Sequence, residues 1–191
     1  RDLRKKGINR IGNIFVPNNR YVAFESFFQP ILKELFSEKK VISPHNIIWK
    51  LGEKINDEKS FCFWAWKNKI PVLCPAIQDG AIGDNIYFFS FNNPDFIIDI
   101  VEDTKILNNT TIGIKKSGII VLGSGVVKHS LLNANMLRNG ADYAVYMNTS
   151  AEYDGSDSGA LPDEAISWGK LKEDSESVKV FGDARFTASM T

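Results

Sequence analysis

Carboxylates, a tryptophan and a lysine are concentrated in one short stretch near the end of the chain. The acidic segment, residues 152–164, has no basic residue and five carboxylates: Glu152, Asp154, Asp157, Asp163 and Glu164. Trp168 and Lys170 follow it. Carboxylates beside an aromatic ring suit a cationic amine, and a partly desolvated lysine can form an imine with a carbonyl carbon. An ordinary solvated loop that leads into a helix is the alternative interpretation.

Other candidate residues stand directly after predicted strands. Ligands of an open parallel sheet bind outside the carboxyl ends of its strands. The candidates in such positions are Asp79 and Asp84, Gly123 and Ser124, Thr149, and Asp183 and Ala184. Glycines and carboxylates recur there, as a dinucleotide and an amine would require.

Each of these signals also has a plain structural interpretation. Gly123-Ser124-Gly125 could hold a phosphate at a helix start or be only a tight turn, since Lys128 replaces the last glycine of the dinucleotide fingerprint. His129 could be a general acid/base or a structural residue.

The two aspartates of the segment 79–84 allow two interpretations as well. Asp79 and Asp84 could form a turn and cap a helix, or contact a ribose or an amine. Lys170 could be a solvated helix lysine. We expect no metal site, because the acidic segment does not match a calcium-binding loop and histidine and cysteine do not cluster.

The elements that must position these residues follow from periodicity and capping signals. We predict a loop at 7–20, helices at 21–39 (with Pro30 inside), 44–55 and 57–68, and then alternating strands and helices. The predicted strands are 70–74, 117–122, 143–147 and 178–181. The later helices are 81–91, a helix through residue 107 into which the apolar run 96–101 leads, 125–138 and 162–171. This order predicts an α/β fold with a parallel sheet and helices on both faces. We expect residues 1–191 to form a single domain.

Composition excludes several classes of partner. The 191 residues carry 23 basic and 23 acidic side chains, so a net charge of zero argues against nucleic-acid binding. No apolar run reaches the roughly 20 residues of a membrane span, so we expect no membrane contact. The two cysteines form no disulfide framework, which favours a reducing compartment and a cytoplasmic protein.

Several motifs together resemble deoxyhypusine synthase over nearly the whole chain. They are residues 7–13 (GINRIGN), 79–84 (DGAIGD), 125–129 (GVVKH), 138–145 (RNGADYAV), 152–159 (EYDGSDSG) and 163–170 (DEAISWGK). The resemblance implies a Rossmann-like NAD-binding fold. It also implies transfer of the 4-aminobutyl group of spermidine to one lysine of the precursor of translation initiation factor five-A, a reaction of hypusine biosynthesis.

The resemblance also implies roles for individual residues. Lys170 matches the enzyme lysine that carries the butylimine, and His129 matches the acid/base at the amine. Asp84, Asp157 and Glu164 match the carboxylates that hold the polyamine, and Trp168 its apolar wall. The dinucleotide side is matched by Asp79, Gly123, Ser124, Thr149, Asp183 and Ala184.

Members of this family are homotetramers with sites at dimer interfaces, so we expect the same assembly here. They are nearly twice as long, so we interpret the chain as the C-terminal half of such an enzyme. Two alternatives stay open. Homospermidine synthase passes the same aminobutyl group to putrescine and resembles this family closely. A non-catalytic partner subunit is the other alternative, although the chain keeps all the matched catalytic residues.

Overall fold

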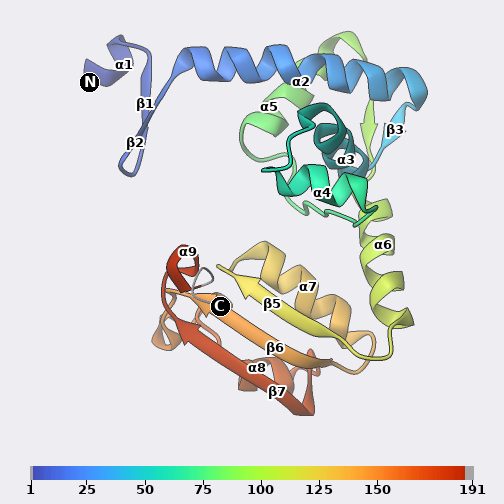
Figure 1. The fold of residues 1–191 in the computed structure, drawn as a ribbon, viewed down its shortest axis with the longest axis vertical. Helices are drawn as coiled ribbons and strands as arrows, with labels where there is room; N and C mark the ends of the chain where they lie inside the picture. Colours follow the sequence, from blue (N-terminus) through green and yellow to red (C-terminus); the bar gives the residue numbers. More distant parts are fainter. Residues whose placement is uncertain (1, 188–191) are drawn as a thin grey trace. The chain divides into compact units, whose positions relative to one another are not determined.

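The chain folds as an α/β protein, as predicted. The computed structural model describes residues 2–187 and divides into two compact units, Arg1–Ile100 and Val101–Thr191. In both units parallel strands are flanked by helices (Figure 1). The single-domain organisation of residues 1–191 stays a prediction. Among the described residues, no helix is long and apolar enough to cross a membrane.

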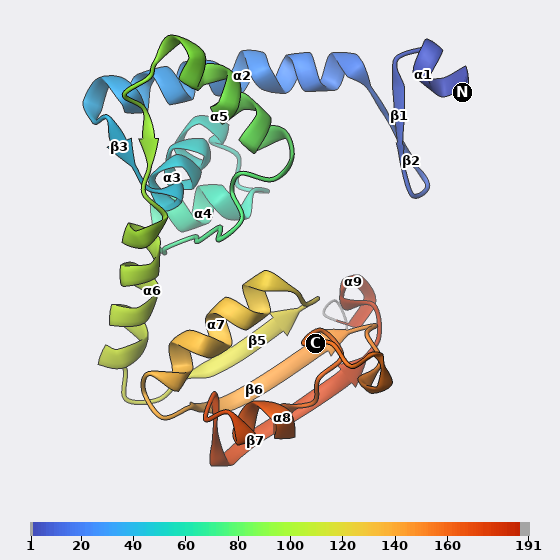
Figure 2. The same ribbon diagram turned by 180° about the vertical axis from the view of Figure 1, so that it is seen from behind.

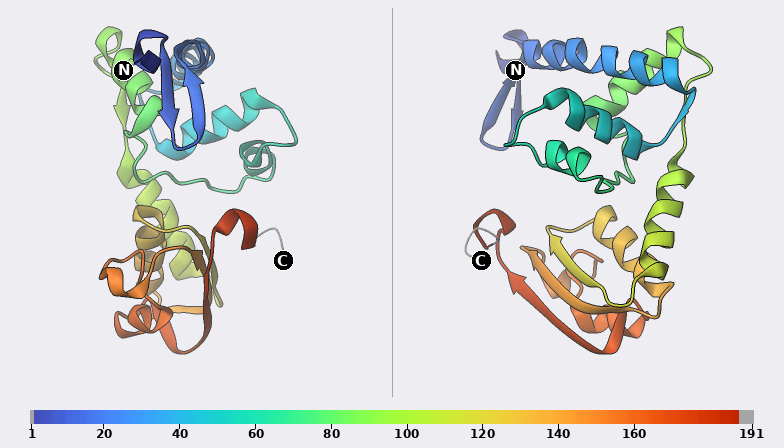
Figure 3. Two further views of the ribbon diagram at one scale, coloured as in Figure 1. Left: turned by 90° about the vertical axis from the view of Figure 1, so that its left-hand side faces the viewer. Right: turned by 45° about the vertical axis from the view of Figure 1, so that its right-hand side comes forward.

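Unit 1 combines a hairpin, a short parallel strand pair and several helices. Its elements are α1 (Asp2–Lys5), β1 (Ile8–Ile11), β2 (Ile14–Pro17), α2 (Asn18–Glu38), β3 (Val41–Ile42), α3 (Pro44–Ile55), α4 (Phe61–Lys67), α5 (Gly80–Asn92) and β4 (Ile97–Ile98). Helix α6 (Ile100–Gly113) begins at Ile100, which is the last residue of unit 1. Strands β1 and β2 are antiparallel (Figure 3), whereas β3 and β4 are parallel.

The predicted helices of unit 1 form because apolar positions and capping signals agree. Helix α2 buries Phe28, Ile31, Leu32 and Leu35 at helical spacing. Helix α3 begins after Ser43, whose side-chain oxygen accepts a hydrogen bond from the backbone N–H of Asn46 at 3.4 Å.

Two predictions for unit 1 are wrong. The segment 7–20 is not a loop, because Ile11 and Ile14 pair around a two-residue turn and close the β1–β2 hairpin. The segment 70–74 is not a strand. Pro71 and Pro75 lack the backbone N–H that a ladder needs, so Asp79 follows a turn instead of a strand.

Unit 2 contains the sheet that carries most of the predicted site. Its elements after α6 are β5 (Gly118–Leu122), α7 (Val126–Met136), β6 (Ala141–Asn148), the 3-10 helix η1 (Glu152–Asp154), α8 (Pro162–Ser167), β7 (Leu171–Phe181) and α9 (Ala184–Thr187). The strands are parallel in the order β5-β6-β7, and their arrows point the same way in Figures 1 and 2. Helix α8 is shorter and strand β7 longer than predicted.

Helices α7 and α8 pack on the same face of this sheet. Ile119 and Val121 of β5 stand beside Ala144 and Tyr146 of β6, and all four are buried with side chains of both helices. On the opposite face Ile120 is 70% exposed, and Leu122 and Val178 are also exposed. The core of unit 2 therefore lies between the sheet and these two helices.

A polar network fixes the amino-terminal edge of β6. The carboxylate of Asp142 accepts hydrogen bonds from Nζ of Lys172 at 2.5 Å, from the backbone N–H of Ser117 at 2.9 Å and from Nη1 of Arg138 at 3.2 Å. These donors hold the pKa of Asp142 well below its usual range, and the lysine makes the largest contribution. One carboxylate thus joins β6 to β7, to the residue before β5 and to the turn after α7.

Candidate active site

The loops after the three strands of unit 2 meet at one edge of the sheet. The backbone N–H of Gly123 donates to the carbonyl of Met147 at 2.8 Å, and the N–H of Gly182 donates to the carbonyl of Asn148 at 3.0 Å. This edge therefore gathers five of the predicted dinucleotide residues, which are Gly123, Ser124, Thr149, Asp183 and Ala184.

The start of α7 fits a phosphate group. Gly123 and Gly125 have φ angles of 88° and 93°, which favour glycine, and an added Cβ at either would meet nothing within 4 Å. Gly125 caps α7 without a side-chain hydrogen bond. The first N–H groups of an 11-residue helix thus have no side-chain cap, and such groups attract anions.

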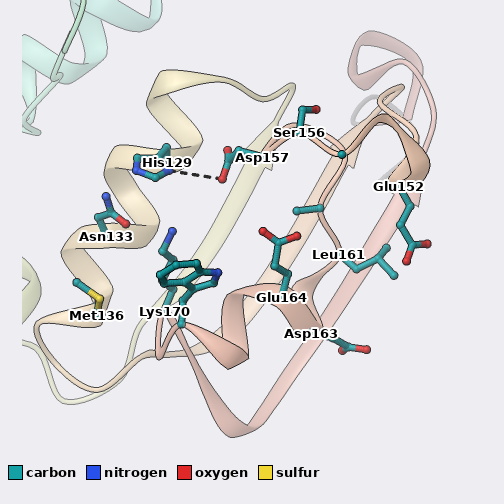
Figure 4. Close-up of a pocket in the computed structure, with 13 residues that line it drawn as sticks. His129, Asn133, Met136, Glu152, Ser156, Asp157, Leu161, Asp163, Glu164 and Lys170 are labelled. Carbon is teal, nitrogen blue, oxygen red and sulfur yellow. Dashed lines mark ion pairs between the residues drawn. The ribbon is translucent and has the colours of Figure 1, made fainter.

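A pocket of about 710 Å³ lies between α7, α8 and the acidic segment (Figure 4). Five predicted site residues line it: His129, Asp157, Glu164, Trp168 and Lys170. They come from three different segments of unit 2, and the fold brings them together around one pocket. Their individual roles stay predictions.

Asp157 stands at the centre of the acidic wall of this pocket. Its Oδ1 lies 3.5 Å from Nδ1 of His129, and Figure 4 marks this ion pair. Its Oδ2 is buried without a hydrogen-bond partner in the described structure. A buried carboxylate oxygen without a partner is costly. The side chain as a whole is 38% exposed and lines the pocket, so the carboxylate can be reached by a cationic ligand.

Figure 4 separates the other carboxylates of the acidic segment. Glu164 points toward Asp157 and Lys170, whereas Asp163 and Glu152 lie farther from the lysine. Asp154 accepts a hydrogen bond from the backbone N–H of Ala151 at 3.2 Å, which stabilises the turn η1. Asp157 and Glu164 are therefore the carboxylates placed to hold an amine near Lys170.

The turn that ends α8 delivers the lysine. Gly169 has a φ of 70°, its N–H donates to the carbonyl of Ile166, and the N–H of Lys170 donates to the carbonyl of Ala165 at 2.9 Å. This is a Schellman motif, which favours glycine at the left-handed position. It reverses the chain between Trp168 and Lys170.

Lys170 is buried, although lysines are mostly exposed. It is 8% exposed and its Nζ lies 5.6 Å from the centre of the Trp168 ring, which is 64% exposed. The ring therefore forms an open wall beside a largely desolvated amine. Such an amine is suited to attack a carbon–nitrogen double bond.

Outside the acidic segment, sequence reasoning missed two residues of the pocket. Asn133 and Met136 line it and belong to α7. They stand four and seven positions after His129, so all three side chains lie on one face of the helix. This spacing would have identified them, because the face of α7 that carries His129 lines the pocket.

Two predicted residues belong to unit 1. Asp79 is the N-cap of α5, and its side chain accepts a hydrogen bond from the N–H of Gly80 at 3.0 Å. Asp84 is an exposed residue of the same helix. The capping interpretation of Asp79 is confirmed. The ribose and amine roles of these two aspartates stay predictions.

Comparisons with known proteins agree with the motifs. The family model described as deoxyhypusine synthase matches residues 1–189. A Dictyostelium discoideum protein named "Probable deoxyhypusine synthase" is 53% identical over 186 residues, which are 95% of this chain and 50% of that protein. "Homospermidine synthase 2" of Senecio vernalis is 51% identical over 191 residues, which are 96% of this chain and 52% of that protein.

A solved structure agrees as well. A crystal structure from Entamoeba histolytica that is assigned to deoxyhypusine synthase is 31% identical, with a TM-score of 0.70, and covers 92% of this chain and 55% of that one. The chain thus spans about half the length of the curated relatives it matches. With the family model matched over residues 1–189, the chain belongs to the deoxyhypusine synthase family.

Proposed function

We propose that this chain carries the amine site of an NAD-dependent transferase that moves the 4-aminobutyl group of spermidine to a lysine of the precursor of translation initiation factor five-A. One observation carries the proposal. A pocket places the carboxylates of Asp157 and Glu164 near the buried amine of Lys170. A polyamine needs such carboxylates, and group transfer needs such a nucleophile.

In this proposal the pocket first binds and orients the amine. Asp157 and Glu164 pair with ammonium groups of spermidine, and the Trp168 ring packs against its methylene chain. His129 takes a proton from the nitrogen whose neighbouring carbon is oxidised. Its contact with Asp157 orients the imidazole.

NAD, when bound, would accept a hydride from that carbon and later return it. The residues at the carboxyl edge of the sheet, with the uncapped start of α7, would hold the dinucleotide, and Gly123 and Ser124 would lie nearest its phosphates. The family to which the chain belongs supports this cofactor.

Lys170 then carries the butyl group. Its amine adds to the carbon of the substrate imine, the bond from that carbon to the departing nitrogen breaks, and 1,3-diaminopropane leaves with a proton from His129. The same exchange in reverse passes the group from Lys170 to the acceptor lysine. We further propose that the assembly is a homotetramer in the cytoplasm.

Transfer to putrescine is the second candidate, because a relative named homospermidine synthase matches about as closely as those named deoxyhypusine synthase. The test incubates the complete natural protein with NAD, labelled spermidine and either acceptor. Label in the factor precursor supports the first function, and label only in homospermidine supports the second. Label in neither acceptor contradicts both. A K170R variant with full activity would favour a non-catalytic partner subunit.

A further inference from the structure

Lys128 is a buried cation to which the proposed reaction assigns no role. It is 3% exposed, and its Nζ donates a hydrogen bond to the backbone carbonyl of Asp157. The same Nζ lies 4.9 Å from the centre of the buried Tyr146 ring. Burying an ammonium is costly unless it is paired. The hydrogen bond of Lys128 to the acidic segment therefore offsets the cost of burying its ammonium group.

Lys128 and His129 bind two ends of the same residue. Neighbouring positions on an α-helix point about 100° apart, so Lys128 is directed toward the sheet and His129 toward the pocket. Lys128 binds the backbone carbonyl of Asp157, while Nδ1 of His129 lies 3.5 Å from the carboxylate. Helix α7 thus holds both the backbone of Asp157 and the direction of its carboxylate.

A second lysine binds the acidic segment from strand β7. Nζ of the half-buried Lys179 donates to the backbone carbonyls of Gly159 at 2.5 Å and Ser150 at 3.0 Å. These two carbonyls stand on either side of the turn that contains Asp157. Because both lysines bind main-chain carbonyls, they leave the carboxylates of the segment available for a ligand.

The packing of the turn supports this arrangement. A Cβ added at Gly159 would lie 2.0 Å from the carbonyl oxygen of Ala151, so the two sides of the turn are in direct contact. Burial lowers the pKa of Lys128, while the negative charge of Asp157 opposes that shift. The position of the lysine is thus coupled electrostatically to the carboxylate that it positions.

We propose that Lys128 and Lys179 are positioning residues that hold the acidic segment through its backbone carbonyls, and so place Asp157 to receive the amine substrate. Their role for the substrate rests on the proposed function. Their role in ordering the segment does not, because it follows from the hydrogen bonds alone.

The test compares K128M and K179M with the parent protein and with K115M, in which an exposed lysine of unit 2 is replaced in the same way. Methionine reaches as far as the Cε of lysine and removes the charged amine. Replacing a buried cation by an apolar group is often tolerated, so we expect the variants to fold. Amide hydrogen exchange of residues 151–161 measures the order of the segment.

Each lysine variant should accelerate exchange in this segment by at least about tenfold, since a charge-assisted hydrogen bond is lost. K115M should leave it unchanged. The double variant should fall short of the product of the two single effects, because both lysines hold one turn. Parental exchange rates in both K128M and K179M would overturn the proposal.

Spermidine kinetics with the complete protein then test the substrate role. K128M should raise KM for spermidine at least about tenfold with a smaller change in kcat, because the carboxylate that binds the amine is displaced. A fall in kcat at constant KM would indicate only a loss of folded enzyme and would contradict the positioning role. If the parent itself fails to bind spermidine, the proposed function fails, while the exchange result still decides whether the lysines hold the segment.

Discussion

Replacing Gly169 with alanine should lower the free energy of unfolding of unit 2 and displace Lys170. A left-handed backbone costs an alanine about 1–2 kcal/mol, and the φ of Gly169 is 70°. An added Cβ would meet nothing within 4 Å, so no clash adds to this cost. Alanine has less conformational freedom than glycine in the unfolded chain, which stabilises the folded state by roughly 0.4–1 kcal/mol. The net loss is therefore about 1 kcal/mol, or roughly a fivefold change in the folding equilibrium.

Urea unfolding followed by circular dichroism measures this loss. G169N should lose less than G169A, because asparagine tolerates the left-handed region better. G118A is the matched control in strand β5, where the new Cβ would make an ordinary contact of 3.7 Å with Tyr143 and no strained backbone is required. If G169A is as stable as the parent, the Schellman turn does not depend on glycine and the account of how α8 delivers Lys170 is wrong.

Three further predictions concern the wall of the pocket, the polar network and the core of unit 1. W168A should weaken spermidine binding by about threefold to thirtyfold in calorimetry, with W168F closer to the parent, while stability stays the same because the ring is 64% exposed. The lowered pKa of Asp142 stabilises the fold above its usual value of about 4, and this stability is lost as pH falls toward the lower folded value. The urea concentration at the unfolding midpoint should therefore decrease in the parent as the pH falls below about 4. An equally steep decrease with pH in D142N would contradict this prediction. G52A should destabilise by about 1–3 kcal/mol, because its Cβ would lie 2.1 Å from the carbonyl oxygen of Cys62, whereas G113A has open space and should be neutral or stabilising.

The elements that the sequence predicts well are those in which local and tertiary signals agree. Strands β5 and β6 are short apolar runs that end at glycine or polar residues, and each buries one face of its side chains in the core of unit 2. Helix α3 combines a capping Ser43 with a proline at its first position. At such sites the residue preferences and the packing favour the same structure.

Apart from the β1–β2 hairpin, the elements that were missed depend on partners that are distant in sequence. The first half of β7, residues 171–177, is mostly polar and carries no strand pattern, yet it pairs with β6 from Ala141 onward. Likewise, β3 is only two residues long and exists because β4 lies beside it. A pattern within one segment does not contain this information.

In the site, too, some residues are identified by local sequence and others only by contacts between distant residues. The acidic segment, Trp168 and Lys170 could be identified from residue type and spacing, and the fold places them in one pocket. The role of Lys128 could not, because its position after a glycine-rich turn suggests only a departure from the dinucleotide fingerprint. Its contact with the carbonyl of Asp157 joins residues 29 positions apart.

Chemical trapping of the enzyme imine tests the central claim most directly. The complete natural protein is incubated with NAD and labelled spermidine, reduced with cyanoborohydride, digested and analysed by mass spectrometry, with K170R as the control. We predict that the label is on the peptide containing Lys170 and is absent from K170R. Label on another lysine, or product formation by K170R at the parental rate, would show that Lys170 is not the covalent carrier.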